Sequence, residues 1–177
     1  MKAANLIPLV LFFCLAVILA YVTNLAGNNN FIPSMVGKKL ESFKTQELTT
    51  NSLITDKDFK QNGLIINLFA SWCVSCQEEH ELVKDLAAKG YKIYGIDVAD
   101  TKAEALNYLK KNGNPYEKVA FDGNRAISIS LGATGIPETY VVNNEGVIYF
   151  HHRGVLDEDI IKNQLLPIVD ELRKKTP

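Results

Sequence analysis

The stretch of residues 64–89 joins an apolar run to a helical pattern through a pair of cysteines. The apolar run ends at Ala70, and the helical pattern begins at Cys73, three residues before Cys76. This order predicts a strand, a tight turn and a helix that carries the first thiol at its N-terminus. A helix N-terminus bears about half a positive charge and unpaired N–H groups, which stabilise a thiolate placed there. Cys73 is therefore the predicted nucleophile.

Cys76 follows almost one helical turn after Cys73, so its sulfur can reach the first sulfur once a mixed disulfide has formed. A purely structural disulfide is the alternative, but such a bridge needs neither a helix N-terminus nor the preceding Trp72. A zinc site would need a second pair of ligands, which the sequence does not offer. We interpret the pair as redox-active, and we expect no metal and no cofactor besides the Cys73–Cys76 disulfide.

The composition argues against several other classes of protein. The chain has 177 residues, of which 47% are hydrophobic, and this is enough for one globular domain with an appendage. Its 19 basic and 20 acidic residues give a net charge of -1, so we expect no nucleic-acid partner. Three cysteines are too few for a disulfide-stapled scaffold, and the third, Cys14, lies in an apolar run.

A mainly apolar segment occupies residues 3–26, and its densest part, residues 9–22, contains no charge. With its flanks the segment just reaches the roughly 20 apolar residues that a membrane span needs. A cleaved signal peptide is the alternative, but no small-x-small cleavage site is clear. The positive charge of Lys2 predicts a cytoplasmic N-terminus. We therefore expect residues 1–27 to be an uncleaved, single-pass membrane anchor.

Residues 28–41 are expected to be a polar linker and a lead-in, and residues 42–177 the globular domain. After the cysteine helix we predict a strand over residues 91–98 and a helix that begins after Thr101 and ends at Gly113. A short strand over residues 119–121 follows. This alternation of strands and helices implies parallel strands joined by crossover helices.

The pattern changes in the last third of the chain. A short helix over residues 124–131 is followed by two extended runs, residues 138–142 and 147–151. The turn Asn143-Asn144-Glu145-Gly146 between them predicts an antiparallel hairpin. A last helix is predicted to begin at Asp157 and to be interrupted at Pro167. A parallel half, a hairpin and a final helix indicate an α/β fold with a central mixed sheet flanked by helices, here preceded by one N-terminal transmembrane helix.

Several motifs resemble those of one known family. The segment Trp72-Cys73-Val74-Ser75-Cys76, followed later by Ile136-Pro137 before a strand, resembles the thioredoxin superfamily, and this implies the thioredoxin-like fold. Together with further motifs in the same order, it resembles the CcmG/DsbE family, which consists of membrane-anchored periplasmic thiol:disulfide interchange proteins of cytochrome c maturation. Those further motifs are Pro33-Ser34, Gly37-Lys38, Gln77-Glu78-Glu79-His80, Gly113-Asn114-Pro115-Tyr116, Phe121-Asp122-Gly123 and Gly132-Ala133-Thr134-Gly135-Ile136-Pro137-Glu138-Thr139.

The resemblance implies a protein-disulfide reductase. Such proteins receive electrons from a membrane thiol transporter and pass them to the disulfide of apocytochrome c, or of another cytochrome c maturation factor that is its haem-ligation partner. Haem attachment needs both apocytochrome thiols reduced in a compartment that is kept oxidising. The implied location is the inner membrane, with the catalytic domain facing the periplasm.

The resemblance also implies roles for residues around the cysteines. It implies that Pro137 is a cis residue facing the cysteine pair, where a substrate strand could pair with the backbone. Trp72, Ile136 and Thr139 are expected beside it at the substrate-contacting surface. The alternative for the proline is a trans residue at the start of a strand.

Asn67 stands six residues before Cys73, where thioredoxin carries a buried aspartate that helps to move the proton of the second cysteine. Two carboxylates could replace that aspartate: Glu79, three residues after Cys76, and Glu138, directly after the predicted cis-proline. We hypothesise that one or both tune the thiols and accept the proton as Cys76 attacks the mixed disulfide.

Two other functions stay open. One is a broader periplasmic thiol reductase or oxidase, because substrate choice resides in surface loops and not in the cysteine pair. The other is a copper chaperone using Cys73, Cys76 and His151, since thiolates and imidazole suit copper; related copper carriers have a wider cysteine spacing, which disfavours it. A peroxidase is disfavoured because Ala70, and not a threonine, stands three residues before Cys73.

Overall fold

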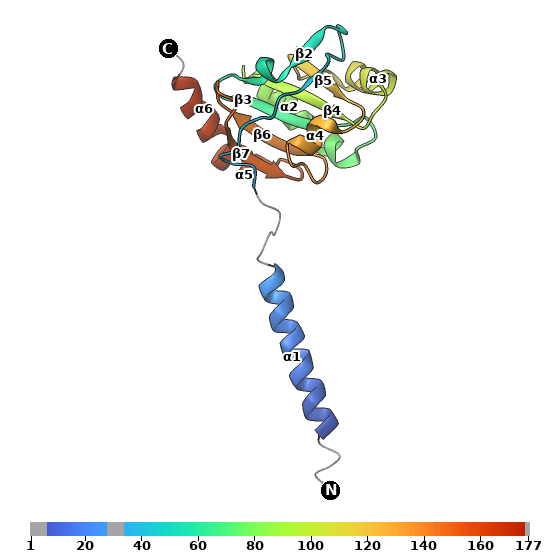
Figure 1. Cartoon of the computed structure of the whole chain (residues 1–177), viewed down its shortest axis with the longest axis vertical. Helices are drawn as coiled ribbons and strands as arrows, with labels where there is room; N and C mark the ends of the chain where they lie inside the picture. Colours follow the sequence, from blue (N-terminus) through green and yellow to red (C-terminus); the bar gives the residue numbers. More distant parts are fainter. Residues whose placement is uncertain (1–6, 28–33, 176–177) are drawn as a thin grey trace. The chain divides into compact units, whose positions relative to one another are not determined.

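The computed structural model describes residues 7–27 and 34–175, and the chain divides into two compact units, Met1–Ser34 and Met35–Pro177 (Figure 1). The first unit contains helix α1, Ile7–Gly27. Its side chains over residues 9–21 are exposed. Within the described residues, no helix is both long and apolar enough to cross a membrane. The predicted transmembrane helix is therefore not confirmed, and residues 1–6 and 28–33, on which parts of the anchor and linker predictions fall, lie outside the description.

The second unit is built on a five-stranded mixed sheet in the order β5-β4-β3-β6-β7. Strands β3, β4 and β5 are parallel, whereas β6 is antiparallel to both β3 and β7. The strands are β3 Leu64–Phe69, β4 Ile93–Val98, β5 Lys118–Asp122, β6 Glu138–Val142 and β7 Ile148–Arg153. The predicted parallel half and antiparallel hairpin are confirmed, with strand ends displaced by one or two residues.

Helices cover both faces of this sheet (Figure 1). Because side chains alternate along a strand, neighbours such as Ile65 and Ile66 belong to different apolar cores. The core around Ile65 includes residues of α2, α3 and α6, and the core around Ile66 includes residues of α4 and of the 3-10 helix η2. These helices are α2 Val74–Ala88, α3 Lys102–Asn112, α4 Ala126–Ser130, α6 Leu166–Lys174 and η2 Asp56–Phe59.

The C-terminal helix starts where it was predicted but changes its winding. Asp157 caps α5, Glu158–Ile160, by accepting a hydrogen bond from the Ile160 N–H at 2.7 Å. A π-helical segment, Ile161–Leu165, then connects α5 to α6, whose first turn contains Pro167. Proline has no N–H to donate and its ring crowds the preceding turn. The helix accommodates it by widening just before the proline and so remains continuous.

A small hairpin before β3 was not predicted. Its strands are β1 Lys44–Gln46 and β2 Leu53–Thr55, and each has only three residues, too few for a periodic pattern. The buried carboxylate of Glu47 accepts hydrogen bonds from the N–H groups of Thr49 and Thr50 in the turn and from the Val119 N–H of β5. This one side chain therefore ties the hairpin to the edge of the sheet.

The described part of the lead-in packs along the other edge of the sheet. The Gly37 N–H donates to the Ile148 carbonyl at 2.8 Å, and the Ile148 N–H donates to the Lys38 carbonyl at 2.9 Å. Met35 and Leu40 are buried in the core around Ile66. The structure thus joins residues 35–40 to the globular unit, several residues before the predicted start at residue 42.

Candidate active site

Cys73 and Cys76 form a disulfide at the start of α2, with a Cα–Cα distance of 5.2 Å. Cys73 is the N-cap residue of this helix, and its Sγ accepts a hydrogen bond from the Cys76 N–H at 3.1 Å. Strand β3 is the central strand and ends at Phe69, so the short turn between strand and helix places the sulfurs at the C-terminal end of this strand. The predicted strand, turn and helix are confirmed.

The loop after β4 holds this turn from the side. The Ser71 N–H donates to the Asp100 carboxylate at 2.6 Å, and the Trp72 indole N–H donates to the Ala99 carbonyl at 3.0 Å. Trp72 is nevertheless 58% exposed, and Val74 after the first cysteine is 71% exposed. An apolar rim therefore adjoins the disulfide and remains accessible to a partner protein.

The Ile136-Pro137 peptide bond is cis, which confirms the prediction for Pro137. Leu68 of β3 pairs with Glu138 of β6, so Pro137 precedes β6 at the same end of the sheet at which β3 runs into the cysteine turn. Ile136 is half-buried and packs against the apolar core that contains Cys73. The fold therefore brings both residues to the cysteine end of the sheet, although more than 60 residues separate them from Cys73 in the sequence.

Thr139 does not belong to an accessible surface. It is fully buried, and its Oγ1 accepts a hydrogen bond from the Asn67 Nδ2 at 3.1 Å. The expectation that it contacts substrate is therefore corrected, because a side chain with no exposed surface cannot touch a docked protein. Thr139 instead supports Asn67 on the neighbouring strand.

Glu79 projects from α2 into the apolar layer beneath the cysteines, where its side chain is buried. Its Oε1 accepts a hydrogen bond from Asn67 Nδ2 at 2.7 Å, and its Oε2 accepts one from the Leu156 N–H at 2.7 Å. Burial raises the pKa of Glu79 to about 7, against the opposite effect of these two donors. A carboxyl group with this pKa can bind or release a proton near neutral pH.

Tyr116 completes the environment of Asn67, and the sequence analysis assigned it no role. Its hydroxyl donates to Asn67 Oδ1 at 2.7 Å, while burial raises the pKa of Tyr116 well above 10. Its ring stacks on Phe69 with the centroids 4.8 Å apart. The signal that could have located it was the Gly113-Asn114-Pro115-Tyr116 motif, which was used only as a mark of family resemblance.

Glu138 differs from Glu79 in its surroundings. Its Oε1 accepts hydrogen bonds from the N–H groups of Thr134 and Gly135, and its Oε2 accepts them from the Tyr140 hydroxyl and His151 Nε2. Burial would raise the pKa of Glu138, but the hydrogen bonds from His151, Tyr140 and Thr134 outweigh it and lower the pKa to about 2. This lowered pKa favours the ionised form of Glu138 near neutral pH and disfavours it as the proton acceptor. Its donors make it a fixed support for the loop that carries Pro137.

His151, the third ligand of the copper alternative, is committed to other contacts. Its Nδ1 accepts a hydrogen bond from the Met35 N–H at 3.2 Å, so Nε2 carries the proton that it donates to Glu138. The side chain is fully buried and stacks on Tyr140. Among the described residues, no three histidine, cysteine, aspartate or glutamate side chains are grouped as a metal site requires.

Asp97 is a second buried carboxyl group that the sequence analysis did not single out. It lies near the end of β4 with no exposed surface, and no N–H or O–H group of the described residues donates to either of its oxygens. Burial, followed by the nearby carboxyl groups of Asp100 and Asp122, raises the pKa of Asp97 to about 8. This raised pKa favours the neutral form of Asp97 near pH 7.

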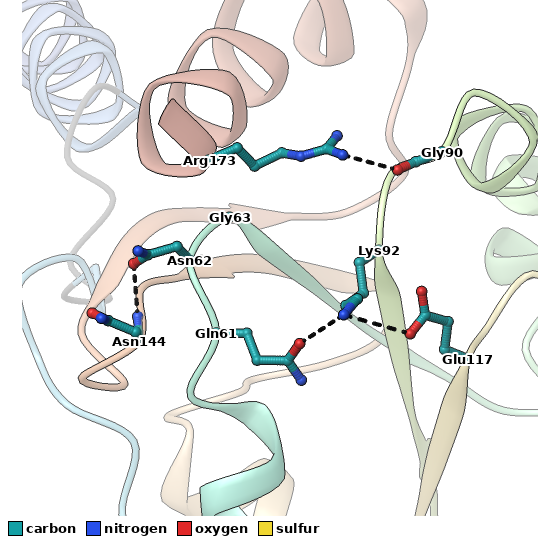
Figure 2. A pocket seen from close by; sticks show the side chains of 8 residues that line it. All are labelled: Gln61, Asn62, Gly63, Gly90, Lys92, Glu117, Asn144 and Arg173. Atoms are coloured by element: carbon teal, nitrogen blue, oxygen red, sulfur yellow. Dashed lines mark hydrogen bonds and ion pairs between the residues drawn. The ribbon is translucent and has the colours of Figure 1, made fainter. Parts of the chain in front are cut away.

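A cleft of about 560 Å³ opens at the opposite end of the sheet. Gly63 immediately precedes β3, whereas the cysteines follow the far end of that strand. Figure 2 shows that the polar side chains of the cleft interact with one another and with the backbone: Lys92 donates to Gln61, and Arg173 donates to the Gly90 carbonyl. The cleft contains no thiol and is separate from the disulfide.

Comparisons with known proteins agree with this geometry. Residues 35–165 match the sequence family described as Redoxin. The thiol:disulfide interchange protein DsbE of Haemophilus influenzae is 33% identical over 99% of this chain and 99% of its own length. The DsbE protein of Tatumella citrea is 32% identical over 98% of this chain and 97% of its own length. The chain belongs to the DsbE family.

Solved structures of other proteins show a similar fold. A secreted thiol-disulfide isomerase from Corynebacterium glutamicum superposes with a TM-score of 0.59 at 24% identity, over 74% of this chain and 85% of its own. A DsbF homologue from Corynebacterium diphtheriae superposes with a TM-score of 0.60 at 23% identity, over 76% of this chain and 86% of its own. Both similarities support the thioredoxin-like fold.

As a DsbE protein with a disulfide at Cys-x-x-Cys spacing, the chain is a thiol:disulfide oxidoreductase. The structure shows its oxidised form. In the reduced form, two electrons are held by two thiols, and disulfide exchange with a partner transfers them.

Proposed function

We propose that this protein is the reductant of a disulfide in cytochrome c maturation. Its substrate would be apocytochrome c or a haem-ligation partner, and a membrane thiol transporter would return its disulfide to the dithiol form. The observation that carries the proposal is the similarity to DsbE proteins over nearly the whole chain. It is supported by Glu79, a buried carboxyl group whose pKa is raised to about 7 on the helix that carries the cysteines. A dithiol that reduces disulfides near neutral pH needs such a proton acceptor.

The reaction we propose has two exchange steps. The Cys73 thiolate attacks one sulfur of the substrate disulfide, forms a mixed disulfide and releases the other substrate sulfur as a thiolate. Cys76 then loses its proton to the Glu79 carboxylate and attacks Cys73 Sγ. This attack closes the Cys73–Cys76 disulfide and releases the second substrate thiolate, so two electrons pass to the substrate and the proton leaves Glu79 for solvent or a thiolate.

The contact surface for the substrate is proposed to consist of the side chains of Trp72 and Ile136 and of the backbone at Pro137, whose own side chain is buried. Trp72 supplies exposed aromatic area, and the cis peptide lies at the end of the sheet where the cysteine turn emerges. Large aromatic side chains carry much of the binding energy of protein interfaces. The carboxylate of Glu138 would hold the loop before Pro137 in place by accepting hydrogen bonds from the Thr134 and Gly135 N–H groups.

We further propose that residues 1–27 anchor the protein in the inner membrane, that the residues between this anchor and Met35 link it to the catalytic domain, and that this domain faces the periplasm. The absence of charge in residues 9–22 and the helical conformation of α1 support the anchor. An anchor would keep the reductant close to its electron donor and to the membrane-bound assembly machinery.

The test is the redox state of the cysteine pair in intact cells, combined with trapping of the substrate. Cells are quenched with acid and free thiols are alkylated, so that reduced and oxidised forms can be counted. We expect the pair to be mostly reduced, and to become oxidised when the membrane electron donor is removed. A cysteine pair that is mostly oxidised both in cells with the membrane electron donor and in cells without it contradicts the reductase proposal.

Trapping identifies the substrate because a Cys76→Ser variant cannot resolve its mixed disulfide. We expect the trapped partners to be apocytochrome c or a haem-ligation factor. A broad set of unrelated partners would instead support the general thiol reductase, the alternative of the same fold. The Cys73→Ser variant is the matched control and should trap none of them.

A further inference from the structure

The amide of Asn67 is the link between Glu79 and the rest of the buried layer. Its Nδ2 donates to Glu79 Oε1 at 2.7 Å and to Thr139 Oγ1 at 3.1 Å, and its Oδ1 accepts from the Tyr116 hydroxyl at 2.7 Å. A rotation of the amide by half a turn would place Oδ1 against the Glu79 carboxylate, where two acceptors would face each other. The hydrogen bond from Tyr116 stabilises the orientation in which Glu79 faces a donor.

Tyr116 itself is held by three features of the fold. Its ring stacks on Phe69 of β3 at an interplanar angle of 22°. Its N–H donates to Asn114 Oδ1 at 3.0 Å, which fixes the loop before β5. Gly95 of β4 leaves the space for both rings, since a Cβ there would lie 2.8 Å from Phe69 Cε1 and 3.0 Å from Tyr116 Cγ. The hydroxyl is therefore directed at Asn67 by a rigid assembly of two strands and a loop.

We propose that Tyr116 is a positioning residue for the proton transfer: by orienting the Asn67 amide, it keeps Glu79 able to accept the proton of Cys76. This inference rests on the proposed role of Glu79. The physical reason is that a donor directed at a carboxylate stabilises its ionised form. Without the Tyr116 hydroxyl the amide loses the contact that selects its orientation, because the Thr139 hydroxyl can accept from Nδ2 or donate to Oδ1. An amide that turns its oxygen toward Glu79 favours the protonated carboxyl group.

The remaining ionisable groups around Glu79 do not compete with this effect. Tyr108 of α3 and Tyr116 itself are phenols whose pKa values are raised by burial, to about 12 for Tyr108, so both stay neutral from pH 5 to 9. The second donor to Glu79 is a backbone group, the Leu156 N–H, which has no alternative orientation. Asp97 lies near Tyr116, and its burial favours its neutral form. The Asn67 amide is thus the adjustable contact of Glu79.

A direct titration of Glu79 tests the inference. The full chain, oxidised and labelled with carbon-13 at glutamate carboxyl groups, is titrated by nuclear magnetic resonance, and Glu79→Gln identifies the signal. We expect Tyr116→Phe, which keeps the stacked ring, to raise the titration midpoint of Glu79 by about one pH unit, a tenfold increase in proton affinity. Tyr94→Phe is the matched control, because Tyr94 is also a buried tyrosine of the sheet region whose hydroxyl accepts a hydrogen bond from a side-chain amide, that of Gln61, away from the cysteines. It should leave the midpoint unchanged.

An unchanged midpoint in Tyr116→Phe overturns the inference, since Tyr116 would then act only by packing. If Tyr116→Phe does not fold, Asn67→Ala tests the same link, because it removes the donor itself: a raised midpoint supports the inference and an unchanged one overturns it.

A rate measurement separates this inference from the proposed function. Reduced protein is mixed with oxidised glutathione, and release of the second glutathione reports the attack by Cys76. The pH dependence of this step should shift in Tyr116→Phe as far as the Glu79 midpoint does, and it should disappear in Glu79→Gln. If Glu79→Gln leaves the pH dependence unchanged, the proposed proton transfer fails, whereas an unshifted Glu79 midpoint in Tyr116→Phe refutes only the role of Tyr116.

Discussion

The side-chain amide of Asn67 donates to the carboxyl group of Glu79 across 2.7 Å, although the two residues lie 12 positions apart on different elements. Asn67 lies on β3, before the cysteine turn, and Glu79 lies on α2, after it. A strand residue thereby supplies a hydrogen-bond donor to a helix residue. The ionisable group sits on the helix, and the strand supplies its donor.

The first prediction concerns the exchange of this donor for an acid. Asn67→Asp places two buried carboxyl groups in contact, and they cannot both ionise, so the pair retains one proton to a higher pH than Glu79 alone. We expect the release of glutathione by Cys76 at pH 7 to slow about tenfold and to recover at higher pH. Stopped-flow kinetics from pH 5 to 9 measure this. Asn62→Asp, at the far end of β3, is the control and should leave the profile as in the wild type.

Asp97 should make the protein less stable as the pH rises. The pKa of Asp97 is about 8 in the folded protein and 3.8 ordinarily, so the folded state binds this proton more tightly than the unfolded state. Its contribution to the free energy of unfolding is therefore complete below pH 3.8 and is lost as the pH rises through about 8. Asp97→Asn cannot ionise, and we expect it to be more stable than the wild type by a margin that grows with pH, by at most about 1.4 kcal/mol per pH unit. Urea unfolding at pH 5, 7 and 9 gives this margin. A stability difference between Asp97→Asn and the wild type that is equal at all three pH values would contradict the prediction. Asp85→Asn, at an exposed position, is the control.

Glu138 should behave in the opposite way. Its pKa is lowered from 4.5 to about 2, so its contribution to stability is present above pH 4.5 and is lost as the pH falls through about 2. Glu138→Gln keeps the size of the side chain but replaces an acceptor oxygen by an NH₂ group, which conflicts with the donors Tyr140 and His151. We expect a loss of about 2 kcal/mol at pH 7 and an unchanged Glu79 midpoint. Thermal unfolding measures the loss of stability, and the carbon-13 titration measures the Glu79 midpoint. A shifted Glu79 midpoint would contradict the expectation that Glu138 and Glu79 titrate independently.

Trp72 should matter for protein substrates and not for small ones. Trp72→Ala removes an exposed aromatic surface beside the disulfide while the cysteines and Glu79 remain. We expect the rate constant for a protein disulfide to fall about tenfold or more, corresponding to an interface contribution above about 1 kcal/mol, and the rate constant for oxidised glutathione to stay within about twofold. The partly exposed Tyr149→Ala on β7 is the control. Equal losses for both substrates would show that Trp72 acts on the chemistry and not on docking.

Much of the site could be predicted because its signals are local. The cysteine spacing, the apolar strand before it and the helical pattern after it lie within 26 consecutive residues, and the strand, the helix and the disulfide were all confirmed. Pro137 was also confirmed as cis. The short hairpin of β1 and β2 was missed because three-residue strands have no periodicity, and its stability comes from Glu47, which bridges to a residue 72 positions away.

The sequence by itself determined which residues exchange disulfides and on what fold. It could not decide between Glu79 and Glu138, because both are acids close to active-site motifs. Only the tertiary structure separated them: Glu79 receives two hydrogen bonds in an apolar layer, whereas Glu138 receives donors from the Thr134 loop, Tyr140 and His151. The same holds for Tyr116 and Asp97, whose surroundings come from distant segments. Protonation depends on burial and on the donors that the fold brings to a side chain, and neither can be read from the neighbouring sequence.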